Sequence, residues 1–133
     1  MMLIQKAIVQ KDDKFLILLR SPDSRFFPEH WDFPGGTLVP NEEPFAGIER
    51  EIIEETGLTV KELKVVATYD MDLSYKDKLI PQRFTIYSTE LLSGDVILSH
   101  EHAQFKWATK EETLQLKIEP FMQLYFEEHF YSR

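Results

Sequence analysis

Three glutamates in the first half of the chain have the spacing of a carboxylate cluster. Glu51, Glu54 and Glu55 stand at positions i, i+3 and i+4, which an α-helix places on one face within an arc of about 100°. Like charges this close destabilise a bare helix, and a divalent cation would reverse the sign of that interaction. Oxygen ligands of this kind suit Mg²⁺ or Mn²⁺, which bind carboxylates and substrate phosphates together. The cluster is therefore a candidate metal site, and its alternative is an ordinary solvated helix face.

The residues around the cluster favour the metal site. Residues 35–58 read GGTLVPNEEPFAGIEREIIEETGL. The pattern G-x5-E-x7-R-E-U-x-E-E-x-G-U, in which U is apolar, is met at all its specified positions, which are Gly36, Glu42, Arg50, Glu51, Ile52, Glu54, Glu55, Gly57 and Leu58. A chance match of this kind has a frequency on the order of 10⁻⁸ per starting position. The segment resembles the complete signature box of the Nudix hydrolase family, and the chain looks like a MutT-like member.

The resemblance implies a role for each charged residue of the box. Glu51, Glu54 and Glu55 would be the carboxylates of a Mg²⁺ site, with Mn²⁺ as a substitute and the backbone carbonyl of Gly35 as a further ligand. Arg50 would support the neighbouring glutamates, and its i+4 spacing to Glu54 suits that role. Glu42 would have a weaker, outer role at the metal site.

The same resemblance implies the hydrolysis of a diphosphate linkage. About two or three Mg²⁺ ions would neutralise the diphosphate and lower the pKa of a bound water. A carboxylate would accept the proton of that water, and the hydroxide would attack phosphorus. The base would be a box glutamate or a glutamate of a late loop, for which Glu101 is the candidate. Its alternative is an exposed loop carboxylate. His100 and His102 flank it, but a zinc site would need a third ligand, so we interpret them as polar surface.

Regular elements on both sides of the box would hold it in place. Residues 3–10, 14–19, 62–70, 82–91 and 104–109 are predicted strands, and 44–56 and 119–130 are predicted helices. Pro44 suits the first turn of the box helix, Glu43 is a weak N-cap, and Gly57 suits a left-handed cap at its end. The element order and the resemblance predict an α/β fold: a Nudix α/β/α sandwich with a mixed sheet, in one domain over residues 1–133.

The apolar side of the box helix is expected to pack on that sheet. It would consist of Phe45, Ala46, Ile48, Ile52 and Ile53. Gly47 lies on the acidic side, where it would leave room beside the carboxylates.

Composition excludes several other classes of protein. The chain has no cysteine, so disulfides, thiolate metal sites and a cysteine nucleophile are excluded. Its 15 basic and 23 acidic residues give a net charge of −8, which disfavours binding to long nucleic acids or membranes. Apolar runs stay short of the ~18 residues that a membrane span needs. We expect a cytoplasmic protein, and a homodimer remains open.

The preferred substrate is expected to be a small nucleotide-like molecule. Trp31, Asp32 and Phe33 precede the box as in triphosphate-cleaving relatives, so a nucleoside triphosphate, cut to a monophosphate and pyrophosphate, is the first choice. Arg20, Trp31 and Phe33 are the candidate substrate-binding residues; the two aromatics would stack on a base or, alternatively, belong to the core.

Other substrates and a non-catalytic role stay open. Arg20, Ser21, Arg25 and Phe33 also resemble the coenzyme A branch, although Glu29 stands where that motif has glycine. Tyr75 lies near a tyrosine position of dinucleoside-polyphosphate hydrolases. Nucleotide sugars are a further alternative. A non-catalytic nucleotide-binding module would be expected to lose box carboxylates, and this chain keeps them all.

Overall fold

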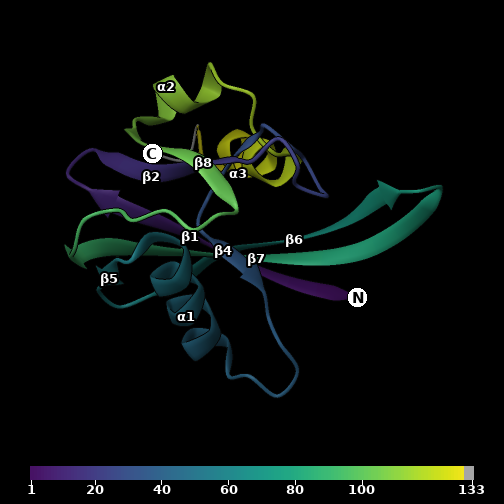
Figure 1. Cartoon of the computed structure of the whole chain (residues 1–133), viewed down its shortest axis with the longest axis horizontal. Coiled ribbons are helices and arrows are strands. Elements are labelled where there is room, and N and C mark those ends of the chain that lie inside the picture. Colours follow the sequence, from purple (N-terminus) through teal and green to yellow (C-terminus); the bar gives the residue numbers. More distant parts are fainter. Residues whose placement is uncertain (131–133) are drawn as a thin grey trace.

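A mixed β-sheet forms the centre of the molecule, and different helices cover its two faces (Figure 1). The computed structural model describes residues 1–130. Its elements are β1 (Met2–Lys11), β2 (Lys14–Arg20), β3 (Trp31–Asp32), β4 (Gly35–Thr37), α1 (Pro44–Thr56), β5 (Thr59–Val60), β6 (Lys64–Tyr75), β7 (Lys78–Ser93), β8 (His102–Ala108), α2 (Lys110–Leu114) and α3 (Pro120–Phe130).

The sheet is organised around β1. This strand runs parallel to β7 and antiparallel to both β2 and β4. β7 pairs antiparallel with β5 and β6, and β2 pairs antiparallel with β3 and β8. The predicted mixed sheet is therefore confirmed.

Alternation along the central strands divides the apolar residues between two cores. Ile8 faces one side, and its neighbours Ala7 and Val9 face the other. The first core packs against α3 through Phe121, Met122 and Phe126. The second packs against α1 through Ile48 and Ile52. The two-sided packing confirms the expected α/β/α sandwich.

The helix of the box has the predicted bounds, but its apolar face is narrower than expected. The Glu43 side chain accepts a hydrogen bond from the N–H of Ala46 at 2.9 Å, and Gly57 ends the helix in the left-handed region with φ 72°. Ile48 and Ile52 are buried, whereas Phe45 is 45% exposed and Ile53 57% exposed. Ala46 is exposed as well. The prediction that Ala46 and Ile53 pack on the sheet is wrong, because the helix contacts the sheet along a narrow stripe. Phe45 does contact the sheet, since its ring packs edge-on against Tyr87 of β7 at a centroid distance of 5.5 Å.

Gly47 also has a different role from the one expected. A Cβ atom there would lie 2.8 Å from Leu38 Cδ1 and 2.9 Å from Gln5 Oε1. A Cβ atom would also lie 3.0 Å from Glu42 Oε1, so the residue allows β1 and the segment before α1 to approach the helix closely.

The hairpin of β6 and β7 is longer than predicted and projects beyond the body of the molecule (Figure 1). Its turn places Lys76 and Asp77 at φ 48° and 63°, the backbone of a two-residue hairpin turn that matches the strand twist. Four short elements, β3, β4, β5 and α2, lie outside the predicted ranges. The capping box of Thr109 and Glu112 at the start of α2 is a sequence signal that could have revealed that helix. Among residues 1–130, no helix is long and apolar enough to cross a membrane.

Candidate active site

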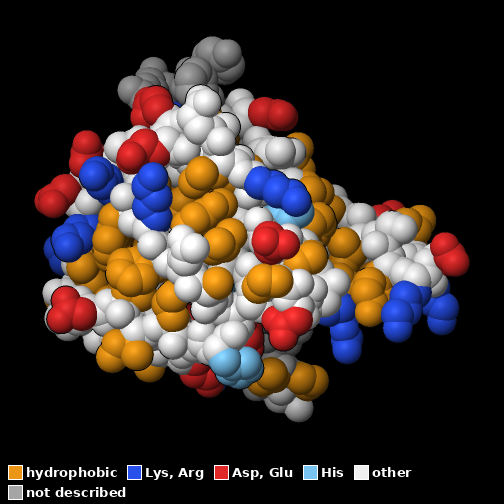
Figure 2. Space-filling view, turned by 45° about the horizontal axis from the view of Figure 1, so that its top comes forward, with side chains coloured by type: hydrophobic (Ala, Val, Ile, Leu, Met, Phe, Trp, Pro, Cys, Tyr) orange, Lys and Arg blue, Asp and Glu red, His pale blue; other side chains and the backbone are white. Residues whose placement is uncertain are grey.

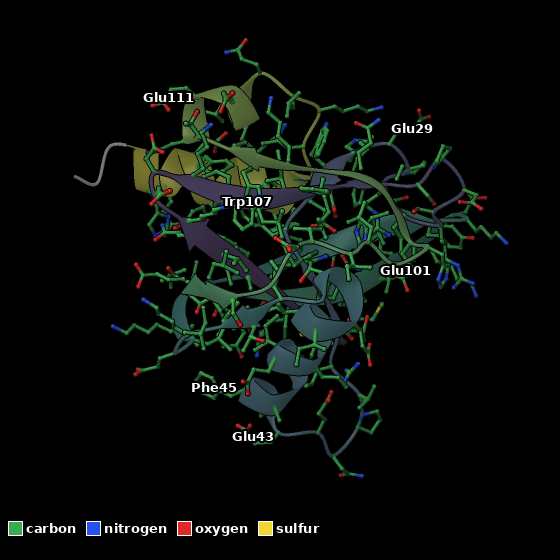
Figure 3. All side chains as sticks on the ribbon, turned by 60° about the vertical axis from the view of Figure 1, so that its left-hand side comes forward. Glu29, Glu43, Phe45, Glu101, Trp107 and Glu111 are labelled. Atoms are coloured by element: carbon green, nitrogen blue, oxygen red, sulfur yellow. The ribbon has the colours of Figure 1, made fainter. Side chains whose placement is uncertain are left out.

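A cleft of about 320 Å³ lies where the inner side of α1 meets the sheet. Its polar end is formed by Gly35, Gly36, Glu51, Glu55 and Glu101. Figure 3 shows Glu101 on the loop that passes beside α1. Backbone hydrogen bonds hold this loop to the end of the helix, from the N–H of Ile97 to Thr56 and from the N–H of Ser99 to Glu55. The fold thus brings a late loop against the box, as the resemblance implies.

Glu55 is the most deeply placed carboxyl group of the box. It is 5% exposed, and its Oε1 accepts a hydrogen bond from the backbone N–H of Gly35 at 2.8 Å. Burial raises the pKa of Glu55 to about 8, against the opposing effects of Lys6 and of the Gly35 N–H. A carboxyl group held in this way gains its charge readily only when a cation is close to it.

Glu51 packs against the glycine pair that precedes the box helix. A Cβ atom on Gly36 would lie 2.6 Å from Glu51 Oε2. Any residue other than glycine at this position would therefore displace the Glu51 carboxylate. Burial raises the pKa of Glu51. Glu51 and Glu55 therefore both present partly desolvated oxygens to the cleft.

Glu54 lies outside the cleft, on the solvent side of α1. Its side chain is 58% exposed and accepts a hydrogen bond from Arg50 Nη1 at 3.1 Å. Arg50 also binds both oxygens of Glu42, at 2.7 and 3.0 Å. Within residues 1–130, no three His, Cys, Asp or Glu side chains are gathered closely enough to hold a metal ion. The structure thus brings Glu51, Glu55 and Glu101 to one cleft and leaves Glu54 on the solvent side. Arg50 Nη1 pairs with both Glu51 and Glu54, at 3.1 Å each.

Phe33 does not reach the cleft, and its predicted contact with a substrate is wrong. The residue is 0% exposed, and its ring packs against Phe15, Phe121 and Phe126 at centroid distances of 5.7, 6.1 and 6.1 Å. No ring face remains for a base. Trp31 is half-buried, packs against the same core and lies outside the residues that line the cleft.

Arg20 does line the cleft, where it belongs to a buried ionic network. Its Nη1 lies 3.2 Å from Asp32 Oδ2, which also accepts a hydrogen bond from Lys6 Nζ at 2.7 Å. Burial alone would raise the pKa of Asp32, but the positive charges of Lys6 and Arg20 beside it help to lower it. Lys6 and Glu119 line the cleft as well.

Lys6 and Glu119 were not predicted from the sequence as residues of the cleft, nor was Asp32 as the centre of the ionic network. A lysine in the middle of the apolar strand LIQKAIV was a usable signal, because a buried lysine needs a paired charge. Glu119 had no comparable local signal.

The two histidines beside Glu101 differ in burial, and the interpretation of His102 as polar surface is wrong. His102 is 7% exposed, its ring nitrogens have no hydrogen-bond partner, and burial lowers its pKa to about 4. His100 is exposed. Glu101 itself is exposed at the rim of the cleft, and its carbonyl accepts a hydrogen bond from the N–H of Ser21 at 3.1 Å.

Known proteins share both this sequence pattern and this fold. The NUDIX domain model matches residues 6–128. A bis(5'-nucleosyl)-tetraphosphatase [asymmetrical] of Caenorhabditis elegans is 31% identical over 104 residues, which cover 77% of this chain and 72% of the relative. The CTP pyrophosphohydrolase of Escherichia coli (strain K12) is 28% identical over 114 residues, covering 86% and 80% of the two chains.

A solved structure extends the likeness to nearly the whole chain. The MutT protein from Methanosarcina mazei Go1 has a TM-score of 0.77 at 26% identity, and the match covers 96% of this chain and 91% of that one. Nudix hydrolases generally use divalent metal ions, and Glu51, Glu55 and Glu101 offer the oxygen donors that such ions prefer. The chain therefore belongs to the NUDIX domain family and is a hydrolase that acts on pyrophosphate bonds.

Proposed function

We propose that this protein hydrolyses nucleoside triphosphates to monophosphates and pyrophosphate, with Mg²⁺ as its cofactor. The observation that carries the proposal is the cleft itself, in which Glu51, Glu55 and Glu101 gather at one end of a volume of about 320 Å³. A volume near the lower limit for small-molecule sites suits one nucleotide.

The residues at the polar end fit a hard divalent cation. Glu51, Glu55 and the carbonyl of Gly35 would hold Mg²⁺, or Mn²⁺ in its place. Glu54 would join them only after turning inward from the solvent side of α1, where its side chain is now 58% exposed. Bound Mg²⁺ supplies charge neutralisation of the diphosphate and a water of lowered pKa.

Other residues of the cleft would orient the substrate and move the proton. Glu101 is our candidate for the general base, because it is exposed at the rim and its backbone is fixed to Ser21. Arg20 and Lys6 place positive charge in the wall of an otherwise acidic cleft, which favours a polyphosphate chain there. Arg50 would keep the outer side of α1 in place through Glu42 and Glu54.

A second candidate substrate is a dinucleoside polyphosphate. Phe26 lines the cleft, and its ring packs edge-on against Tyr75 at 5.1 Å. The Arg25 guanidinium lies 5.9 Å from the Tyr75 ring and Lys76 Nζ lies 5.4 Å from it. Figure 2 shows basic side chains gathered at the projecting end of the molecule. This aromatic and basic rim would suit a second nucleotide, and the relative from Caenorhabditis elegans is named as a tetraphosphatase of that substrate class.

A substrate panel tests the proposal. The four common nucleoside triphosphates, inosine triphosphate, a dinucleoside tetraphosphate, a nucleotide sugar and coenzyme A would be compared by kcat/KM with Mg²⁺, with products separated chromatographically. We expect a monophosphate and pyrophosphate from a triphosphate, and no turnover in chelator. A preference of about a hundredfold, roughly 3 kcal/mol, for another class would contradict the triphosphate assignment.

A further inference from the structure

One buried side-chain amide connects the two halves of the box. Gln5 of β1 is 3% exposed, and its main chain pairs with Gly36 of β4. Its Nε2 donates to the carbonyl of Pro44, the first residue of α1, at 2.8 Å, and to the Tyr87 hydroxyl of β7 at 2.8 Å. Gln5 therefore links the strands that hold the glycine pair to the start of the helix that carries the glutamates.

A row of residues on α1 faces β1 and β4 (Figure 1). Gly47, Glu51 and Glu55 follow one another at intervals of four residues, which places them along one ridge of the helix. A Cβ atom on Gly47 would lie 2.9 Å from Gln5 Oε1. The helix therefore rests directly on the Gln5 side chain, one turn before the first of the two carboxyl groups.

The two carboxyl groups of the row meet the glycine pair in the same order. A Cβ atom on Gly36 would lie 2.6 Å from Glu51 Oε2, and the N–H of Gly35 donates to Glu55 Oε1 at 2.8 Å. Because the helix moves as one body, a shift of its first turn on β1 would displace both carboxyl groups from the glycines.

The hydrogen bonds of Gln5 determine which way its side chain points. The Pro44 carbonyl can only accept, so the NH₂ group must face it. Oε1 then stays buried without a hydrogen-bond partner among residues 1–130, which is unfavourable for stability. Gln5→Met combined with Tyr87→Phe would fill nearly the same space and leave no unpartnered polar side chain. Stability alone therefore does not account for the amide.

We infer that Gln5 is a positioning residue for the metal site. Its amide fixes the first turn of α1 on β1, and this contact sets the places of Glu51 and Glu55 relative to the glycine pair. Gln5 is not one of the described residues that line the cleft, so it acts through α1 and not on the substrate. The inference rests on the proposed function, because the site that Gln5 positions is the one we propose for Mg²⁺.

Two measurements without substrate test this role. The first is the binding of Mn²⁺, followed by the EPR signal of the free ion. The second is the hydrogen-exchange rate of the Gly35 N–H in chelator, measured by NMR, which reports its hydrogen bond to Glu55 in the absence of metal. Gln5→Met should weaken Mn²⁺ binding by about tenfold. It should also speed the exchange of the Gly35 N–H by about tenfold.

A double variant separates positioning from stability. Gln5→Met leaves the buried Tyr87 hydroxyl without a partner, so it should lower the melting temperature. Adding Tyr87→Phe removes that hydroxyl and should bring the melting temperature back to within about 3 °C of the parent. Both readouts should stay as in Gln5→Met, because the bond to Pro44 is still missing. Tyr87→Phe alone keeps that bond and should change both readouts by less than about twofold.

Thr89→Val is the matched control. Thr89 is a polar residue of β7 that is 4% exposed, and its hydroxyl donates to the carbonyl of Lys61 at 2.8 Å. Neither residue lines the cleft. The variant removes one buried hydrogen bond between a side chain and a carbonyl, so it should lower the melting temperature without changing Mn²⁺ affinity or Gly35 exchange.

An unchanged Mn²⁺ affinity and unchanged Gly35 exchange in Gln5→Met would overturn the inference. Recovery of both readouts in the double variant would do so as well, because Gln5 would then be only a core residue. Losses of equal size in Thr89→Val would show general destabilisation and would also overturn it. If Gln5→Met alone does not fold, the double variant decides by the same two readouts.

Failure of the proposed function would give a different result. A parent protein that binds no Mn²⁺ would contradict the proposed metal site. The exchange of the Gly35 N–H in chelator would still decide whether Gln5 positions α1, because that measurement needs no metal.

Discussion

Glu54 and Glu55 are neighbours in the sequence, yet they lie on opposite sides of the boundary between solvent and cleft. The Glu54 side chain is 58% exposed and shares Arg50 with Glu42. Glu55 is 5% exposed and accepts the N–H of Gly35. Both belong to the same acidic motif, and the 100° step between them separates their surroundings. The motif therefore supplies the carboxyl groups, whereas the packing of Gly35, Gly36 and β1 against α1 determines which of them is removed from solvent.

Exchanging the buried charge should have the largest effect on turnover. Glu55→Gln keeps a carbonyl for the Gly35 N–H but removes the charge that we propose binds Mg²⁺, so kcat should fall by roughly 10³ or more, about 4 kcal/mol. Glu54→Gln removes the same charge from the exposed side and should cost about tenfold or less. Steady-state kinetics with saturating Mg²⁺ would measure both. Equal losses in the two variants would remove the distinction between the two sides of the helix.

Glu101 extends the comparison to a carboxylate outside the box. If Glu101 is the general base, Glu101→Gln should lower kcat by about 10²-fold and flatten the acidic limb of the pH–rate profile. High Mg²⁺ should not restore the rate. Recovery at high Mg²⁺ would make Glu101 a metal ligand, and an unchanged rate would move the search for the base to Glu51, Glu54 and Glu55.

The glycine pair offers a milder test. Gly36→Ala would place a Cβ atom 2.6 Å from Glu51 Oε2, and the flexible end of that side chain can move, so the fold should persist while kcat/KM falls by about tenfold. Gly35→Ala would meet the backbone of Gln5 at 1.9 Å at a φ of 150°, so it should prevent normal folding. Kinetics and thermal melts of both variants would be compared. A fully active Gly36→Ala would show that the position of Glu51 is not critical.

A further effect is expected on stability rather than on turnover, and its size depends on pH. Because burial raises the pKa of Glu55 to about 8 in the metal-free protein, the folded state binds this proton more tightly than the unfolded state. Stability is therefore lost as the pH rises from about 4.5 to 8. In chelator, Glu55→Gln should be more stable than the parent by about 2–4 kcal/mol at pH 8.5 and nearly equal to it at pH 4.5. Denaturant unfolding at both pH values would measure this, and a constant difference would contradict it.

Local features of the sequence predicted the box helix and its two ends. Pro44 and Gly57 act within a turn of their own positions, so their effect does not depend on the rest of the fold. Helical spacing could not show that Phe45 and Ile53 are exposed, because the width of the contact stripe depends on the sheet.

Contacts between residues that are far apart in the chain could not be predicted from the sequence. The aromatic residues Phe26, Phe27 and Phe33 lie within one short segment, and the first two line the cleft while the third enters the core. Lys6, Asp32 and Glu119 come from β1, β3 and the start of α3. No local pattern relates positions so far apart, so the network became visible only in the structure.

The parallel pairing of β1 with β7 also has a consequence for the order of folding. Its register runs from Met2 opposite Gln82 to Gln10 opposite Glu90. The central strand β1 therefore cannot pair with β7 until about 80 further residues have been synthesised. Contacts of such long range are closed late and slow the folding of a domain. A nascent chain that ends before Lys78 lacks β7, so α1 can pack only on an incomplete sheet that contains β1 and β4. The cleft therefore assembles among the last parts of the molecule, after most of the chain has left the ribosome.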